Sequence, residues 1–209
     1  MTIRTAKSRD AKDLARLHIE CSKAQPGGFM HRLGLGFLVE YYRVSMKEKF
    51  CLIIVAEDED GKIVGLHSGT LRAEEHAEML RRSKWRLGMA SLPRVLRNPK
   101  LIFDSMARAN SGSADTEKDG YVVKTGPRGE YWGWSPSSSN PGGALALHRA
   151  WHEMMKAMGA TLVRSEIDTC NSRILKFAKT MGARVVKEMQ TPEGEKRLIL
   201  EYDLAAYGK

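Results

Sequence analysis

The sequence predicts an α/β fold in which a mixed β-sheet carries helices on both faces. Its 209 residues are enough for a single domain with a substantial core, covering residues 1–209. The composition, 42% hydrophobic and 28% charged, is ordinary for a globular protein. Short β-rich runs alternate with amphipathic stretches, and we find no internal repeat. The expected order is β-α-α-β-β, an insert, and then β-α-β-α-β-β.

A short strand, two helices and a β-hairpin make up the predicted first half. Ser8 or Asp10 can cap the first helix, whose apolar residues recur every three or four positions. A Pro-Gly-Gly break at residues 26–28 ends this helix. An Asp-Gly turn at Asp60 joins the two strands of the hairpin. The predicted strands cover residues 3–5 and 51–56, and a third strand begins at residue 63. The second helix covers residues 37–42.

Residues 71–128 form the predicted insert, which is helical at first and loop-like later. We expect interruptions of its helical part at Pro93 and Pro99, and residues 111–120 have the composition of a loop. Positive charge is concentrated in the stretch 81–100. Such a stretch can lie on a membrane surface, dock an acidic partner, or form a solvated helical face over a substrate cleft. Its apolar residues include Trp85, Leu87, Leu92 and Leu96.

The predicted second half alternates strands with two helices and closes with a hairpin. The first of these helices ends at Gly159 and the second at Gly182, because glycine readily takes the left-handed conformation that ends helices. A turn at 191–194 joins the last two strands. The predicted strands cover residues 130–134, 161–168, 185–186 and 198–202. The first helix is expected to bury Leu147, Trp151, Met154, Met155 and Met158.

Charge and cysteine content narrow the class of protein. The formal net charge of +9 favours anionic partners without identifying one. No apolar run approaches the roughly 18 residues of a membrane span, and the N-terminus lacks the apolar core of a secretory signal. Cys21, Cys51 and Cys170 are odd in number and far apart, which suggests neither a disulfide framework nor a cysteine metal site. We therefore expect a cytoplasmic protein with no membrane span and no metal.

Two segments about thirty residues apart carry the strongest functional signal. In the first, Trp134-Ser-Pro-Ser-Ser-Ser-Asn-Pro-Gly-Gly-Ala144, a predicted strand leads through a tight turn into a helix. Unpaired N–H groups and the helix dipole make such a helix start a site for anions. In the second, Glu166-Ile-Asp-Thr-Cys-Asn171, an Asn opens the next helix. Its side chain adds a polar group near the same end of the sheet.

This order of segments resembles the GNAT acyltransferase superfamily, and is similar to bacterial members with a basic helical insert. Members usually read V-x-P-x-x-R/Q-G-x-G-x-G/A at the turn that holds the pyrophosphate of acyl-CoA. Trp134 stands at the apolar position, Pro136 matches, and Gly142 and Ala144 match the last small positions. The resemblance implies a CoA site formed by Trp132, Trp134, Ser139, Asn140, Gly142, Gly143, Ala144 and Asn171.

The chain departs from the family pattern at both segments. Ser139 and Asn140 replace the usual Arg/Gln and Gly, and Pro141 removes one N–H donor. The family's second segment, N-x-x-A-x-x-L/F-Y-x-x-x-G-F, is matched at Asn171, but Ala178 takes the place of the Tyr that protonates the departing thiolate in many relatives. Further matches at this segment are Phe177 and Gly182, and substitutes for the Tyr are Cys170 or Tyr202.

Carboxylates on two predicted strands are the candidate proton acceptors. In the family a Glu on the fourth strand often deprotonates the ammonium, and Glu130 is the matching candidate. The alternative is a solvated carboxylate at a strand edge. Glu166 and Asp168 share one face of the next strand by alternation. They can orient a cationic acceptor, assist the base, or simply pair with Arg164 or a helix Lys.

Other motifs give weaker signals. His148 and His152 are one helical turn apart, a spacing that can bind zinc, but Arg149 stands where a metalloprotease has Glu. With no third ligand evident, a packed or surface pair of histidines is the simpler interpretation. The chain has neither a G-x-G-x-x-G turn nor a P-loop, and no recognition motif for nucleic acid accompanies its charge.

The resulting hypothesis is an acyl-CoA-dependent N-acyltransferase with acetyl-CoA as the default donor. It would transfer the acyl group by direct attack of an amine on a small metabolite or nucleotide-sugar. One alternative uses an acyl carrier protein as donor, docked on the basic insert. Another is a non-catalytic CoA-binding or membrane-associated module. A homodimer is compatible with the sequence, which identifies neither the acceptor nor the acyl chain length.

Overall fold

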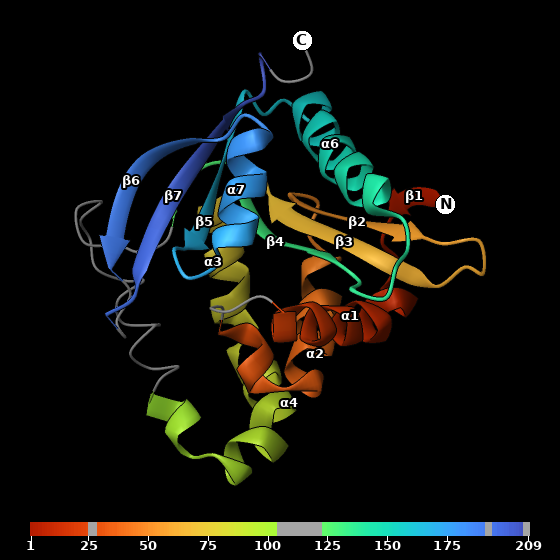
Figure 1. Cartoon of the computed structure of the whole chain (residues 1–209). Helices are drawn as coiled ribbons and strands as arrows, with labels where there is room; N and C mark the ends of the chain where they lie inside the picture. Colours follow the sequence, from red (N-terminus) through yellow and green to blue (C-terminus); the bar gives the residue numbers. More distant parts are fainter. Residues whose placement is uncertain (25–28, 104–122, 191–193, 207–209) are drawn as a thin grey trace.

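A seven-stranded mixed sheet forms the centre of the protein (Figure 1). The computed structural model describes residues 1–24, 29–103, 123–190 and 194–206. The order across the sheet is β1-β2-β3-β4-β5-β7-β6, and β4 and β5 are parallel while all other neighbours are antiparallel. The strands are β1 (Thr2–Thr5), β2 (Cys51–Glu57), β3 (Ile63–Thr70), β4 (Arg128–Trp134), β5 (Leu162–Asp168), β6 (Arg184–Gln190) and β7 (Lys196–Asp203).

Helices cover both faces of this sheet (Figure 1). On one face lie α1 (Ala11–Ala24) and α2 (Leu35–Ser45), and on the other lie α6 (Pro141–Ala157) and α7 (Ser172–Thr180). Between β3 and β4 come α3 (Ala73–Arg82) and α4 (Lys84–Arg97), which project below the sheet in Figure 1. Two short 3₁₀ helices, η1 (Ser8–Asp10) and η2 (Met30–Leu33), precede α1 and α2. The predicted element order is confirmed.

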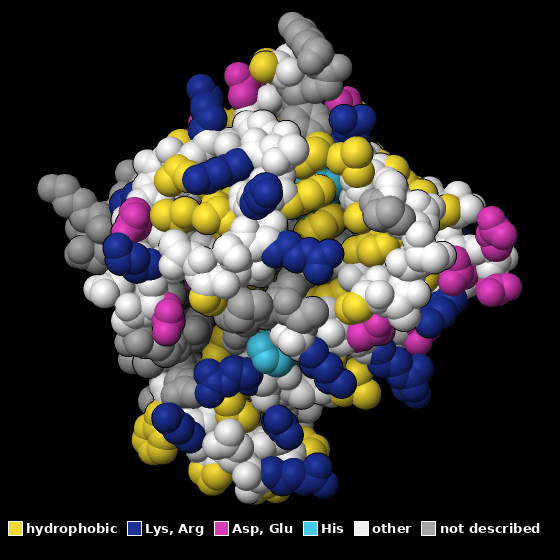
Figure 2. All heavy atoms as spheres, viewed as in Figure 1, with side chains coloured by type: hydrophobic (Ala, Val, Ile, Leu, Met, Phe, Trp, Pro, Cys, Tyr) yellow, Lys and Arg dark blue, Asp and Glu magenta, His cyan; other side chains and the backbone are white. Residues whose placement is uncertain are grey.

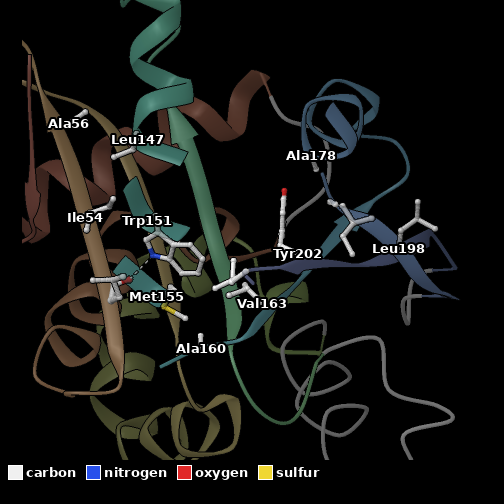
Figure 3. Packing of buried hydrophobic residues seen from close by; sticks show 14 of the residues in the cluster. Ile54, Ala56, Leu147, Trp151, Met155, Ala160, Val163, Ala178, Leu198 and Tyr202 are labelled. Carbon is white, nitrogen blue, oxygen red and sulfur yellow. Dashed lines mark hydrogen bonds between the residues drawn. The ribbon is translucent and has the colours of Figure 1, made fainter. Parts of the chain in front are cut away.

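Alternation along β2 explains the two cores. Leu52 and Ile54 face α6, where Trp151 is fully buried, whereas Ile53 and Val55 face α1 and α2. Figure 3 shows the first core, in which the Trp151 indole N–H donates to the Leu52 carbonyl at 3.3 Å. Satisfying this donor allows a large aromatic side chain to be buried without an unpaired polar atom.

Two details of the sequence-based expectation are wrong. Pro93 does not interrupt its helix but lies inside α4, on an exposed part of the helix where water can satisfy the carbonyl that loses its donor. The break falls at Ser83 instead, between α3 and α4. Met158 is exposed rather than part of the core, because α6 ends just before it. The expected features at 26–28, 111–120 and 191–193 lie outside the described residues.

Candidate active site

The two central strands separate soon after they meet. Their parallel pairing consists of Arg128 with Arg164 and Gly129 with Ser165, and beyond these pairs the strands diverge. The pairing of β3 with β4 also shifts between Ser68 and Gly69, so that Glu130 is an extra residue in β4. Such a bulge bends a strand and redirects its side chains. We call the opening that results the β4/β5 gap.

A cavity of about 460 Å³ occupies the β4/β5 gap. It is lined from one helical layer by His18, Met30 and His31, and from the other by His148 and Phe177. Since residues of both layers contribute, the cavity reaches through the opened sheet. Two molecules can therefore approach each other from opposite faces.

Glu130 lies at this cavity in a tightly paired setting. One carboxylate oxygen is 2.8 Å from Arg128 Nε, 2.5 Å from Arg128 Nη2 and 2.9 Å from His76 Nδ1. Burial alone would raise the pKa of Glu130, but the Arg128 guanidinium and the His76 ring outweigh it and lower the pKa to about 2. The carboxylate is thus ionised at neutral pH. The sequence identified Glu130 but missed Arg128 and His76.

Glu166 and Asp168 both line the cavity, as do Ser165 and Ile167 beside them, yet the settings of the two carboxylates differ. Asp168 pairs with Arg197 of β7 at 2.6 Å, not with the expected Arg164, which bonds Glu201 instead. Glu166 is buried and accepts a 2.5 Å hydrogen bond from the backbone N–H of Val123. Burial raises the pKa of Glu166 and the nearby Glu130 adds to this effect, although Arg128 opposes it. Two carboxylates of opposite pKa shift therefore face one cavity.

Aromatic rings and histidines form another wall. Trp132 of β4 stacks on Phe177 of α7, with ring centroids 4.6 Å apart, across the β4/β5 gap. His148 and His152 are buried, as the simpler interpretation predicted, and pack with His67 of β3. Burial lowers the pKa of His152 to about 4 and that of His148 to about 2, so both are neutral at pH 7. In the described part of the chain no group of three or more His, Cys, Asp or Glu is placed to hold a metal.

Tyr202 of β7 is a further member of this wall. Its ring centroid lies 4.4 Å from that of His152, and it lines the cavity together with Ala178. Figure 3 shows the ring standing between β7 and α7, with its hydroxyl directed toward α7. Cys170 is exposed and does not line the cavity.

The turn after β4 starts α6 as the sequence indicates. Asn140 is its N-cap, and the Asn140 Oδ1 accepts from the Gly143 N–H at 3.0 Å. A Cβ on Gly143 would lie 2.4 Å from a ring carbon of Trp134, so glycine is needed there to admit the indole. A Cβ on Gly142 would meet only the Asn140 Oδ1, at 3.5 Å. Gly142 is therefore the open position of this helix start.

The neighbouring polar residues are mostly engaged within the protein. The Ser135 hydroxyl donates to Glu20 and contacts the Ser137 hydroxyl, while the Ser138 hydroxyl accepts from the Asn140 N–H. Asn171 caps α7 through a 3.4 Å bond from the Ile174 N–H and also lines the cavity. Among these serines, Ser137 and Ser139 are exposed.

The structure brings together only some of the predicted site residues. Glu130, Trp132 and Asn171 line the cavity. The remaining ones belong to the turn that follows β4 or to the end of that strand, outside the cavity lining; they are Trp134, Ser139, Asn140, Gly142, Gly143 and Ala144. The cavity and the helix start of α6 therefore adjoin opposite ends of the strand segment 130–134.

A mixed sheet that opens between two parallel central strands, with a helix start following the first of them, defines the fold of the GNAT N-acetyltransferases. Solved structures agree with this fold. The yncA protein from Salmonella typhimurium, solved with its cofactor acetyl-CoA, is similar over 100% of this chain and 96% of its own, with a TM-score of 0.60 and 11% identity. A ribosomal-protein-alanine N-acetyltransferase from Brucella melitensis is similar over 97% and 99%, with a TM-score of 0.61 and 11% identity.

A third similar structure is the ribosomal-protein-S18-alanine N-acetyltransferase from Escherichia coli, with a TM-score of 0.56 and 12% identity over 100% of this chain and 96% of its own. No model of a known protein family matches the sequence, and no curated protein matches it. The likeness is therefore one of fold, carried by the arrangement of strands and helices rather than by sequence.

The site has features that fit a bound acyl-CoA. Trp132 Nε1 and His67 Nδ1 are buried atoms with no hydrogen-bond partner among the described residues. Buried polar atoms of this kind normally find a partner, and a ligand amide can supply one. The Gly142 N–H likewise has no backbone acceptor in the described parts of the chain, and a Cβ there would meet only the Asn140 Oδ1. Trp132 and His67 line the cavity, and Gly142 lies in the first turn of α6.

Proposed function

We propose that this protein is an acyl-CoA-dependent N-acyltransferase, with acetyl-CoA as donor and an amine as acceptor. The observation that carries the proposal is the β4/β5 gap, whose cavity is open to both helical layers and adjoins a strand that leads to a helix start. A thioester can lie along the free edge of β4 while an amine approaches from the α1 side. Alignment of this kind can supply roughly 7–11 kcal/mol of barrier lowering.

The acceptor is proposed to be a small cationic metabolite. Three carboxylates line the cavity, namely Glu130, Glu166 and Asp168. Arg128 and Arg197 pair with Glu130 and Asp168, so the acidic excess that would favour an ammonium group rests on Glu166. An anionic nucleotide-sugar fits this field less well. Attack of the neutral amine nitrogen on the thioester carbon forms the amide bond and breaks the carbon–sulfur bond. The proton that the nitrogen then loses balances the one that the departing thiolate takes up.

Glu166 is proposed as the base, and Glu130, the base that the sequence suggested, is the second candidate. A carboxylate with a pKa of about 2 accepts a proton weakly, whereas catalysis favours a base whose pKa lies near the working pH. The raised pKa of Glu166 makes it the better matched acceptor. In this scheme Glu130 holds the ammonium and Glu166 receives its proton.

The departing thiolate needs a proton, and Tyr202 is proposed to donate it. Ala178 provides no acid at the position where relatives often have Tyr, and Cys170 lies away from the cavity. Tyr202 lines the cavity from β7 and can reach the same space. A cytoplasmic location is proposed too, in keeping with three cysteines that form no disulfide.

The placement of the donor is tested at Gly142. In Gly142→Glu a carboxylate would meet the pyrophosphate, so acetyl-CoA binding measured by calorimetry is expected to fall at least about a hundredfold, equivalent to ~2.7 kcal/mol. Gly142→Ala is the control, because its methyl group enters open space and removes no N–H. Equal affinity of all three proteins would place the diphosphate elsewhere.

The two carboxylates are distinguished by pH–rate profiles. If Glu166 is the base, the acidic limb of kcat lies above the ordinary Glu range and disappears in Glu166→Gln. If Glu130 is the base, that limb lies near pH 2 and Glu166→Gln leaves it unchanged. Carrier-protein donation remains the alternative, and it predicts turnover with acyl carrier protein but not with acetyl-CoA.

A further inference from the structure

The outer face of α4 carries an apolar stripe that the acyl-transfer site does not use. Trp85, Met89, Leu92 and Leu96 are 78%, 67%, 41% and 72% exposed. Their spacing of four, three and four residues places them along one side of the helix, and we call them the outer stripe. The opposite side is buried through Leu87 and Ser91, which pack toward α2. The helix therefore has apolar residues on two opposite sides, one packed against the protein and the other exposed.

The outer stripe lies in strongly cationic surroundings. From Leu80 to Phe103 every ionised side chain in the sequence is basic, and α4 has no acidic residue. Figure 2 shows the consequence on one face of the molecule: the lower lobe, where α4 lies, displays Lys/Arg and hydrophobic groups and no Asp/Glu. These seven basic residues are Arg81, Arg82, Lys84, Arg86, Arg94, Arg97 and Lys100.

We propose that α4 is an interfacial helix that binds the surface of an anionic lipid bilayer. A Trp- and Leu-bearing stripe flanked by Lys and Arg inserts between headgroups while the cations contact anionic lipids. Ile102 and Phe103 extend the exposed apolar surface beyond the helix. No helix in the described part of the chain is long and apolar enough to cross a bilayer, so attachment would be peripheral.

The chemistry of α4 favours a lipid surface over two other occupants. Arg81 and Arg82 pair with Glu78, and Arg86 pairs with Glu40. A second copy of the chain would still bring Lys84 and Arg97 against the same residues, and like charges repel across a shared surface. A specific protein interface usually buries about 800 Å² on each partner, more than four side chains in a row provide. An acidic protein would satisfy the cations but would leave the outer stripe without a function.

Vesicle sedimentation tests the apolar part of this proposal. The full-length chain is expected to sediment with vesicles containing about 30% phosphatidylglycerol in phosphatidylcholine, and not with pure phosphatidylcholine. The double variant Trp85→Ser/Leu96→Ser should bind at least about tenfold more weakly. The control Val185→Ser/Val186→Ser removes exposed apolar side chains from β6 and should bind like the wild type. Circular dichroism confirms that each variant is folded.

Charge reversal tests the electrostatic part. Lys84→Glu/Arg97→Glu should reduce sedimentation with the anionic vesicles about tenfold or more, as should roughly 0.5 M salt, which screens surface charges. Lys12→Glu/Lys156→Glu is the matched control, because it makes the same change in net charge at exposed lysines of α1 and α6. Equal losses in the two variants would reduce the effect to net charge and overturn the proposal.

Tryptophan fluorescence reports the depth of insertion. Trp85 is the most exposed of the four tryptophans, so a blue shift on adding anionic vesicles is expected to come from it. Trp85→Phe should sediment nearly as well but show no shift. Binding without any shift in the wild type, or equal binding to neutral and anionic vesicles, would contradict the proposal. So would a dimer in solution that the serine variant dissociates, because the outer stripe would then be a contact between copies.

Discussion

Gly142 and Gly143 are adjacent glycines with different physical reasons to be glycine. Gly143 is buried against Trp134, and a Cβ there would also lie 2.7 Å from the Met1 Sδ. Gly142 is exposed and faces open space. A family pattern of small residues treats the two as equivalent, but the structure packs Gly143 against an indole and leaves Gly142 open.

This difference gives a paired prediction about stability. Gly143→Ala should lower the free energy of unfolding by about 1–3 kcal/mol, because the added methyl group overpacks the contact with a rigid indole. Gly142→Ala should change it by less than about 0.5 kcal/mol. Urea unfolding followed by circular dichroism measures both. Similar effects of the two substitutions would mean that Trp134 moves away from Gly143.

The ion pair at Glu130 makes stability depend on pH. Because the folded pKa of about 2 lies below the ordinary value of 4.5, Glu130 stabilises the protein fully above pH 4.5, and this contribution is lost as pH falls toward 2. Glu130→Gln should be less stable than the wild type by about 2–4 kcal/mol near neutral pH, since it leaves Arg128 buried without its charge partner.

The same reasoning predicts how this difference changes in acid. The difference in free energy of unfolding between the wild type and Glu130→Gln should decrease steadily from pH 4.5 to pH 3. The reason is that the wild type loses a stabilisation that the variant never had. Unfolding free energies measured at several pH values check this. A gap that stays constant over that range would show that the carboxylate is not selectively stabilised by Arg128.

Patterns of single residues predicted part of the site. Glu130, Trp132 and Asn171 could be identified because a strand or a helix start gave them a position relative to a known motif. Alternation places Arg128 on the same strand face as Glu130, two residues earlier. Alternation alone, however, does not predict which side chains on that face form ion pairs. His76 could not be found, because it comes from α3 and nothing in its local sequence indicates that it meets β4.

At the level of elements, the start of α6 satisfies itself in the absence of a ligand. The Asn140 side chain accepts from the Gly143 N–H, one of the groups that a phosphate would otherwise contact. The capping side chain and an incoming diphosphate therefore compete for the same donor. The usual family glycine at this position would present no such competition.

This competition predicts an effect of Asn140→Ala that depends on ligand. Without ligand the variant should be less stable by about 1 kcal/mol, the usual contribution of an N-cap. With saturating acetyl-CoA the loss should largely disappear, because the diphosphate takes over the cap. Thermal unfolding with and without acetyl-CoA measures both values. An equal loss in the two conditions would place the anion away from the Gly143 N–H.

Helix and strand positions were predictable where periodicity was strong. The strands with continuous apolar runs and the helices ending at Gly159 and Gly182 appear where expected, and both glycines have positive φ. The interruption predicted at Pro93 was wrong because the position of a proline within a helix decides whether it is tolerated. The solvated outer face of α4 supplies that tolerance, and this exposure is a property of packing that the local sequence does not contain.

For the whole molecule, the sheet behaves as two halves joined at Arg128–Arg164 and Gly129–Ser165. One half is β1 to β4 and the other is β5, β7 and β6. The order of the elements along the chain is predicted by periodicity and turn signals, whereas their order across the sheet, with β7 between β5 and β6, is seen only in the structure. The separation of β4 from β5 is seen only in the structure, since no residue pattern within either strand indicates where their pairing stops.

A ligand in the β4/β5 gap should therefore protect strands from both halves at once. With acetyl-CoA at about a hundred times its Kd, the protein should gain ~2.7 kcal/mol of stability. Amide exchange should slow along residues 130–134, at the free edge of β4, more than along β1. Exchange followed by mass spectrometry tests this. Protection confined to α4 or β6 would contradict ligand binding in the gap.

An opened sheet also has consequences for how concentrated samples behave. Besides the outer edges at β1 and β6, the sheet has inner borders along β4 and β5, where the two strands no longer pair with each other. Unmatched borders are places where a strand from another molecule can add and start aggregation. Storage with coenzyme should therefore keep the purified protein dispersed for longer than storage without it.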